Sequence, residues 1–501
     1  MRDDSRSLAI SLLLFIFSFI LRLSFISKGP YSIDGLSIML HAQKLLDTHS
    51  FEYHFGFGYP LTIILAAVFV GLGRLFSVGP EIAVNFMSVV FGSLCIPLFY
   101  LFARSLMGNV FAALCAILLS LCPIFISVSV YGIGHTPALF FLLGGLLLLI
   151  KFFQEGRFNL LVLGAVSFGA CGASRIQDLI LFLPALTYFF FLNQKFLPDC
   201  NAMAFKVRMR FFLVFLFVCL FFSFLFHLPF LGEKTYFQQL NYFQKVSIIN
   251  FADVNLIWKK FLYNLKCLTQ TLSLLGMILC VGGLGLLAKE RPFVFVFLLG
   301  WILTPLYLLC NLNTIVARHQ ILILPPLIMA ECYLLTSFLR HGRLFRLSAL
   351  FLYGLIIVWT FGYYLPPFVY RHRHSSLIEY SQSMEKLTET NARIIGGETD
   401  PFIEHYGHRK SLERMLRDKH VLEDTELSNY KKKLEGLLDE GTPLYITETG
   451  LYTYDFEEKF SNFMKMNFRL EYVGTSKYED WHRDYLQRVF FIDTLYRIKK
   501  K

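Results

Sequence analysis

Charged residues are scarce in this 501-residue sequence. Asp, Glu, Lys and Arg make up 17% of it, against about 25% in a soluble domain, whereas hydrophobic residues make up 55%. The deficit comes from repeated apolar runs of about 20 residues, the length that crosses a bilayer as a helix. The composition therefore excludes an ordinary soluble enzyme and predicts a polytopic α-helical membrane protein.

Motifs for metals, disulfides and nucleotides are also missing. The ten cysteines lie in or beside apolar runs, none follows Cys332, and no pair has the CxxC spacing. We therefore expect them to be small buried hydrophobic residues. Gly396-Gly397 follows a predicted strand, but the full GxGxxG pattern is absent, so a tight turn is the favoured interpretation.

The net charge of +11 does not indicate a nucleic-acid partner. Much of the Lys and Arg lies in short loops between apolar runs, as the positive-inside rule predicts for a membrane protein. The charge therefore reports orientation, and we expect no nucleic acid to bind.

The apolar runs predict about 11–12 transmembrane helices. Eleven are expected at 8–27, 81–103, 109–129, 135–153, 158–173, 176–193, 210–230, 266–288, 292–310, 319–339 and 346–366. The first is taken as a retained span, because it is too long for a signal-peptide core. A twelfth run, 61–76, is short and is interrupted by Gly71 and Gly73.

The positive-inside rule decides how to treat residues 61–76. If this run does not cross and the N-terminus is cytoplasmic, all the basic loops lie on the cytoplasmic side. These loops carry Arg104, Lys151, Arg157, Lys195–Arg210, Lys289, Arg291, Arg340, Arg343 and Arg346. We therefore predict a re-entrant or surface-lying helix at 61–76, in a multi-pass protein of the plasma (inner) membrane.

This topology divides the chain into a transmembrane domain, 1–366, and a soluble domain, 367–501. The outer face then contains the loop 28–80, the loop 231–265 and the soluble domain. Loop 231–265 mixes aromatic residues with Lys and Gln, which fits interfacial helices or an ordinary aromatic belt. The soluble domain is predicted to be an extracytoplasmic α/β domain, with buried strands at 392–396 and 443–447.

Basic residues on the outer side go against the expected charge bias and need a reason. They include Arg22, Lys28, Arg175 and Arg318, which lie near the ends of spans. Ionisable groups at membrane depth are functional candidates, and Arg and Lys suit a phosphate-bearing substrate. The alternative for each residue is a side chain that reaches the lipid headgroups.

Several short motifs carry a resemblance to a known family through their order and spacing. They are Ile33-Asp34-Gly35 after a span that ends near Arg22, the turn Gly58-Tyr59-Pro60-Leu61, and Ala317-Arg318-His319 before Leu324-Pro325-Pro326-Leu327. The chain resembles the GT-C class of membrane glycosyltransferases, which includes protein O-mannosyltransferases and the lipid A aminoarabinose transferase. These enzymes use a polyprenyl-phosphate sugar as donor.

The resemblance implies that Asp34 is the catalytic carboxylate and that a lipid, glycan or protein acceptor receives the sugar. The expected donor-phosphate ligands are Arg318, Arg175, Lys28 and Arg22, and the expected substrate-binding residues are His135, His319, Tyr59 and Tyr31. A carboxylate can remove the acceptor proton, while cations stabilise the departing phosphate. An alternative is that Asp34 only caps the helix that begins near Gly35.

Two departures from the family pattern bear on metal binding. Many relatives have Asp-Glu where this chain has Asp34-Gly35, and His135 stands in a loop where relatives often place an acid. The loss of both acids weakens the case for a divalent cation, since hard cations prefer several oxygen ligands. No metal-binding residue is assigned, and a divalent cation stays open.

Other functions remain to be weighed against the transferase. A transporter or flippase of lipid-linked glycans would have broken helices at the midplane and an inverted repeat, and the sequence has no visible repeat. A polymerase or ligase of lipid-linked glycans differs mainly in its acceptor. A non-catalytic scaffold leaves the outward cations unexplained.

Overall fold

The structure is a computed structural model. It describes residues 2–51, 59–195, 197, 203–230, 254–311, 317–412, 424–452, 455, 458–481 and 488–501. Part of the predicted interfacial loop, residues 231–253, lies outside these ranges, as does Gly58 of the predicted turn. Contacts divide the chain into two units: Met1–Ile26 with Ile38–Val369, and Ser27–Ser37 with Tyr370–Lys501.

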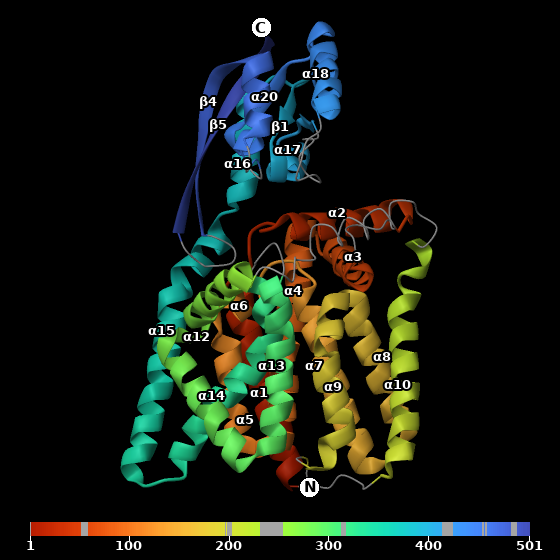
Figure 1. Ribbon diagram of the computed structural model, residues 1–501, viewed down its shortest axis with the longest axis vertical. Helices are drawn as coiled ribbons and strands as arrows, with labels where there is room; N and C mark the ends of the chain where they lie inside the picture. The colour runs from red at the N-terminus through yellow and green to blue at the C-terminus, as the bar shows by residue number, and fades with distance from the viewer. Residues whose placement is uncertain are drawn as a thin grey trace. The chain divides into compact units, whose positions relative to one another are not determined.

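Long apolar helices build the first unit, and Figure 1 shows them packed along one another. They are α1 (Arg2–Leu23), α4 (Pro80–Met107), α5 (Asn109–Leu121), α6 (Pro123–Ser129), α7 (His135–Glu155), α8 (Phe158–Ser174), α9 (Ile176–Leu192), α10 (Phe205–Leu225), α12 (Val254–Glu290), α13 (Pro292–Asn311), α14 (Leu324–Leu339) and α15 (Arg343–Arg373). Short 3-10 turns η1 (Asn193–Lys195), η2 (Leu228–Phe230) and η3 (Ala317–Ile323) connect some of them.

Helices form at all eleven predicted spans. In the described part of the chain, nine helical segments are long and apolar enough to cross a bilayer. A tenth is the pair α5–α6, which bends by 62° where Pro123 interrupts the hydrogen-bond ladder. The last is α8, an apolar helix of 17 residues. The protein is therefore a polytopic helical membrane protein.

Two shorter helices follow α1. They are α2 (Ile33–Thr48) and α3 (Pro60–Leu75), which covers the predicted non-crossing run 61–76. α3 packs against α4 and α8, and Arg74 Nη1 lies 2.8 Å from the Asp47 carboxylate near the end of α2. This ion pair links the C-terminal ends of the two short helices.

The second unit contains a five-stranded sheet in the order β2-β1-β3-β5-β4. The strands are β1 (Arg393–Ile395), β2 (Lys410–Ser411), β3 (Leu444–Thr447), β4 (Phe468–Trp481) and β5 (Arg488–Lys500). β1 is parallel to β2 and β3, whereas β5 is antiparallel to β3 and β4. The helices are α16 (Ser376–Leu387), α17 (Asp400–Tyr406), α18 (Asp424–Asp439), α19 (Glu448–Tyr452) and α20 (Lys459–Asn467), with the 3-10 turn η4 (Gly397–Thr399).

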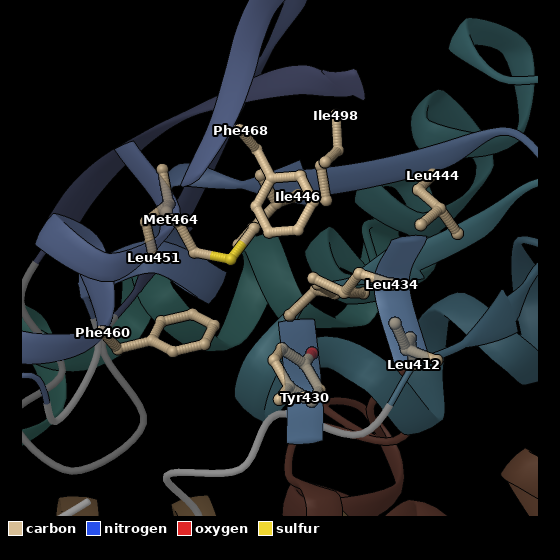
Figure 2. Packing of buried hydrophobic residues seen from close by; sticks show 11 residues of the cluster. Leu412, Tyr430, Leu434, Leu444, Ile446, Leu451, Phe460, Met464, Phe468 and Ile498 are labelled. Carbon is tan, nitrogen blue, oxygen red and sulfur yellow. The ribbon is translucent and has the colours of Figure 1, made fainter. Parts of the chain in front are cut away.

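Alternation along the strands gives this sheet two apolar faces, since successive side chains point to opposite sides. On one face, Ile395 and Ile446 pack with residues of α18, α19 and α20. Figure 2 shows Ile446 among the side chains of these helices. On the other face, Ile394 and Tyr445 pack with residues of α16 and α17. The predicted strands at 392–396 and 443–447 are confirmed as β1 and β3, and a sheet buried on both faces supports an α/β unit.

Candidate functional site

Arg175 stands at the junction of two membrane helices. It lies between α8 and α9 with an extended backbone (φ −159°, ψ 98°), which separates the two helices. Its side chain is only 3% exposed, and its Nε lies 3.2 Å from the carboxylate of Asp178, one turn into α9. A buried guanidinium needs such a partner, because an uncompensated charge is costly in a low-dielectric interior.

His135 reaches Arg175 from the first turn of α7. Its Nε2 lies 2.7 Å from Arg175 Nη1, and its Nδ1 lies 3.1 Å from the same atom. The preceding turn is fixed by α4: the Gly132 N–H donates to Asn85 Oδ1 at 2.7 Å, and the Ile133 N–H donates to Ser88 Oγ at 3.2 Å. α4 therefore sets the position from which His135 meets the arginine.

His319 approaches the same guanidinium from η3. Its Nδ1 lies 3.2 Å from Arg175 Nη2, and the ring centroids of His135 and His319 are 5.6 Å apart. η3 is held in place by Gln320, whose amide donates to the Asn264 side-chain oxygen at 3.0 Å and to the Asn264 carbonyl at 3.1 Å. Positions far apart in the sequence thus converge on one arginine.

Two further predicted residues belong to this cluster. The Arg175 guanidinium carbon lies 5.8 Å from the centre of the Tyr59 ring, a cation–π distance. Half-buried Arg318 interacts electrostatically with His135 and with Arg175. We define the Arg175 cluster as the following set: Tyr59, His135, Arg175, Asp178, Arg318 and His319.

The charges of the Arg175 cluster suit an anion. It contains two guanidinium groups and one carboxylate, so it carries a net positive charge when both imidazoles are neutral. An imidazole nitrogen that accepts a hydrogen bond from Arg175 must be unprotonated. Guanidinium groups bind phosphate oxygens through forked N–H donors. The cluster therefore combines donors and positive charge with an aromatic ring.

Asp34 lies in the first turn of α2, in the segment that belongs to the second unit. Ser32 caps this helix: its Oγ accepts the Gly35 N–H at 3.0 Å, and its carbonyl accepts the Leu36 N–H at 3.0 Å. Asp34 is thus inside the helix and is not its N-cap. In the same segment, Lys28 is exposed and Tyr31 is buried.

Arg22 lies in the interior of the helix bundle. Its side chain is fully buried, and its Nη1 donates to Ser18 Oγ at 2.5 Å and to Ser120 Oγ at 3.4 Å. The guanidinium carbon also lies 4.9 Å from the centre of the Phe125 ring. Its described neighbours lie on α1, α4, α5 and α6, since Gly92 and Cys95 of α4 are also close to the guanidinium, and they include no member of the Arg175 cluster.

Metal ligands do not gather in the described ranges. No group of three or more His, Cys, Asp or Glu side chains there has the arrangement of a metal site. Both imidazoles of the Arg175 cluster face a guanidinium, which repels a second cation. The cluster thus does not fit a divalent ion. The nine cysteines in the same ranges are buried and form no disulfide.

Asp178 and Arg371, which contact expected site residues in the first and the second unit respectively, were not among the expected site residues. Asp178 follows Arg175 at the i, i+3 spacing that pairs side chains on a helix, and this spacing is a signal that could have identified it. Arg371 stands in a basic run after Pro366-Pro367, where its sequence context gives no sign of burial.

Comparisons with known proteins agree with this fold. Residues 62–227 match the family model described as dolichyl-phosphate-mannose-protein mannosyltransferase. No curated protein shows significant similarity to the chain. The archaeal oligosaccharyltransferase AglB from Archaeoglobus fulgidus, solved with an inhibitory peptide and a dolichol-phosphate, is 13% identical, with a TM-score of 0.61 over 96% of this chain and 74% of that chain.

A second similar structure is ArnT from Cupriavidus metallidurans, solved bound to undecaprenyl phosphate. It is 12% identical to the chain, with a TM-score of 0.57 over 98% of this chain and 97% of that chain. Identities this low show a shared fold, while the family match covers the segments that contribute His135 and Arg175. The family match over residues 62–227 and the fold shared with AglB and ArnT agree with the resemblance to GT-C membrane glycosyltransferases that the sequence motifs indicate.

Proposed function

We propose that this protein transfers a sugar from a polyprenyl-phosphate donor to a lipid, glycan or protein acceptor on the extracytoplasmic face of the membrane. The observation that carries the proposal is the Arg175 cluster. It offers a buried, hydrogen-bonded arginine, Arg175, at the junction of two membrane helices, together with half-buried Arg318, and the phosphate of a membrane-anchored donor would lie at such helix ends. Two proteins of similar fold were solved with polyprenyl phosphates, which supports the same donor class.

Arg175 and Arg318 are proposed to bind the donor phosphate. As the bond between the anomeric carbon and the phosphate oxygen breaks, negative charge grows on that oxygen. Fixed cations that face this charge lower the barrier, because they need no reorganisation during the step. Lys28 and Arg22 remain proposed phosphate ligands. Arg22 is the more demanding proposal, because Ser18 and Ser120 already accept hydrogen bonds from its Nη1.

Asp34 is proposed as the general base. The acceptor hydroxyl or amine attacks the anomeric carbon, the electron pair of the breaking bond goes to the phosphate oxygen, and the acceptor proton goes to the Asp34 carboxylate. One displacement of this kind inverts the anomeric centre. The cap by Ser32 supports the assignment of Asp34 as base. Because Ser32, and not Asp34, accepts the hydrogen bond of the Gly35 N–H, capping α2 does not account for Asp34.

The remaining substrate contacts are proposed for aromatic and imidazole groups. Tyr59 offers a ring face beside Arg175, and sugars as well as lipid chains pack on such faces. His135 and His319 orient the guanidinium through hydrogen bonds. Tyr31 is a proposed substrate contact on the Asp34 segment.

Sugar transfer in a reconstituted system tests the proposal. Purified protein in liposomes is given polyprenyl-phosphate sugars, and transfer is compared between the wild type, Asp34→Asn and the matched control Asp47→Asn on the same helix. We expect Asp34→Asn to lose about 100-fold or more in rate while it still binds polyprenyl phosphate. Wild-type transfer by Asp34→Asn would contradict the assignment of the base. Absence of polyprenyl phosphate binding by the wild type would contradict the donor class.

Orientation has its own test. A single cysteine is placed at exposed Lys432 on α18, because the cysteines in the described ranges are buried and should not react. In intact cells, a membrane-impermeant maleimide should label Lys432→Cys from outside the plasma membrane. Labelling that requires disruption of the membrane would contradict an extracytoplasmic C-terminal unit.

Transport of a lipid-linked glycan is the second candidate. The specific observation is that α12 is interrupted at Ser273 (φ 67°, ψ 163°) and that the α5–α6 pair bends by 62°. Discontinuous helices of this kind occur in transporters. A transporter would move labelled lipid-linked glycan across the liposome membrane without forming a new glycosidic bond. The same assay therefore separates the two functions.

A further inference from the structure

The segment that carries Asp34 groups with the C-terminal residues and not with the helix bundle that precedes it. Residues Ser27–Ser37 form one compact unit with Tyr370–Lys501. Chain continuity alone would favour the opposite grouping, because α1 and most of α2 belong to the bundle. The reason for the grouping lies in the contacts around Arg371.

Two contacts join Arg371 to this segment. The Lys28 N–H donates to the Arg371 carbonyl at 3.0 Å, and the Arg371 guanidinium carbon lies 4.3 Å from the centre of the Tyr31 ring. Arg371 is in the last turn of α15, where helix carbonyls lack a partner within the helix. Lys28 supplies that partner, and the cation–π contact fixes the segment at a second point three residues later.

Close packing adds a third point. A Cβ atom at Gly29 would lie 2.5 Å from Ser375 Oγ and 2.8 Å from the Ile378 side chain. The backbone at Gly29 therefore lies directly against residues that follow Arg371. Between Lys28 and Tyr31 the segment has little freedom to shift, and the N-cap Ser32 follows immediately.

From these contacts we infer that Arg371 is a positioning residue for the transfer reaction, which holds Asp34 in place by anchoring residues 28–32 to the start of the C-terminal unit. The inference rests on the proposed role of Asp34 as base. Arg371 itself touches the Asp34 segment and is not assigned a contact with substrate. The C-terminal unit then contributes to catalysis by fixing the base, in addition to any role in acceptor binding.

The test compares Arg371→Met with Arg373→Met, which removes an exposed arginine from the same helical turn. Hydrogen–deuterium exchange of the full-length protein in detergent should show faster exchange across residues 28–36 in Arg371→Met only. The rate constant kcat should fall by about 10- to 100-fold, because small displacements of a reacting group are costly. Binding of polyprenyl phosphate should weaken by a smaller factor than kcat, because the proposed ligands Arg175 and Arg318 are unchanged and only Lys28 lies in the loosened segment. Arg371→Lys should recover part of kcat through its retained charge over the Tyr31 ring.

Several results would overturn the inference. Unchanged exchange across residues 28–36 in Arg371→Met would mean that Arg371 does not hold the segment. Faster exchange with wild-type kcat would mean that holding the segment does not matter for transfer. An equal loss in Arg373→Met would indicate a general charge effect. A wrong assignment of Asp34 as base is detected by a different measurement. In that case Asp34→Asn would transfer sugar at the wild-type rate, whatever the hydrogen–deuterium exchange of Arg371→Met shows.

Discussion

The Nη1 atom of Arg175 lies 2.7 Å from Nε2 of His135, in the interior of the helix bundle. An arginine is protonated at all physiological pH values, so the imidazole must accept this hydrogen bond. With Asp178 on Nε and His319 on Nη2, the guanidinium plane is held by three side chains. Such fixed donors stabilise charge that develops during a reaction better than mobile ones do.

Arg175→Lys is expected to weaken binding of polyprenyl phosphate by about 10- to 100-fold, the loss that follows from one or two charge-assisted hydrogen bonds. Lysine keeps the positive charge and so still compensates Asp178, but it lacks the planar fork. Binding to the purified protein is measured by titration with polyprenyl phosphate. Arg157→Lys, at an exposed position between α7 and α8, serves as control and should bind like the wild type. Equal affinities for the two variants would contradict a phosphate role for Arg175.

His135→Gln and His135→Phe separate the hydrogen bond of His135 from its volume. Glutamine keeps an acceptor oxygen for Arg175, whereas phenylalanine leaves the buried guanidinium with one acceptor fewer, at a cost of about 1–3 kcal/mol. We expect the phenylalanine variant to have the lower midpoint of thermal unfolding and the weaker donor binding. Both are measured in detergent solution. The idea that His135 orients Arg175 fails if the two variants behave alike.

Glu389 gives the C-terminal unit a predictable response to pH. The Tyr445 hydroxyl donates to the Glu389 carboxylate, and Arg497 lies 3.2 Å from its other oxygen. The hydrogen bond from Tyr445 lowers the pKa of Glu389, and burial together with this carboxylate raises the pKa of Tyr445 to about 12. Stability from Glu389 is thus present above its unfolded pKa of about 4.3 and is lost as the pH falls through the lower folded pKa.

At high pH, the dependence of stability on pH has the opposite sign and comes from Tyr445. Stability from neutral Tyr445 is complete below its unfolded pKa of about 10 and is lost as the pH rises through about 12. Glu389→Gln should therefore flatten the acid side of the stability curve. It should weaken the alkaline side without removing it, because burial is the largest cause of the raised pKa of Tyr445. The acid effect is small because Glu389 is exposed. The acid-side effect is measured as the midpoint of thermal unfolding at several pH values between about 3 and about 6, a range that includes the ordinary pKa of a glutamate carboxyl group. An unchanged acid slope would show that Glu389 is not coupled to folding.

Much of the bundle could be predicted from the sequence, because apolar runs and the basic loops between them follow from the bilayer. The charge bias of the loops selected Arg175, and the family resemblance added His135 and His319 as expected substrate-binding residues. Neither could show that they meet, since Arg175 and His319 are 144 positions apart and their contact depends on how α9 and η3 pack.

Other features depend on close packing and on helix ends. Ser32 could have been recognised as an N-cap, because Ser directly before a helical pattern is a known signal. The anchoring of residues 28–32 by Arg371 had no such signal, since a carbonyl at the end of a long helix looks like any other in the sequence. Long-range backbone contacts of this type require the folded structure.

Gly134 lies where α7 begins, and its lack of a side chain allows the close approach that brings His135 to Arg175. A Cβ atom there would lie 2.9 Å from Thr62 Oγ1 and 3.3 Å from the Ser174 carbonyl oxygen. Backbone cannot move away as easily as a flexible side chain, so Gly134→Ala should displace the start of α7. We expect weaker polyprenyl phosphate binding, by about tenfold if one charge-assisted hydrogen bond is lost.

Gly144→Ala is the matched control on the same helix. A Cβ atom at Gly144 would meet only Ser167 Oγ, at 3.5 Å, an ordinary contact distance. Because alanine is favoured over glycine inside a helix by about 1 kcal/mol, this variant should be as stable as the wild type or more so. Thr62→Ala combined with Gly134→Ala removes the nearer clash and should recover part of the binding. If Gly134→Ala binds donor as the wild type does, the spacing between α7 and the α8–α9 junction does not determine how Arg175 meets the phosphate.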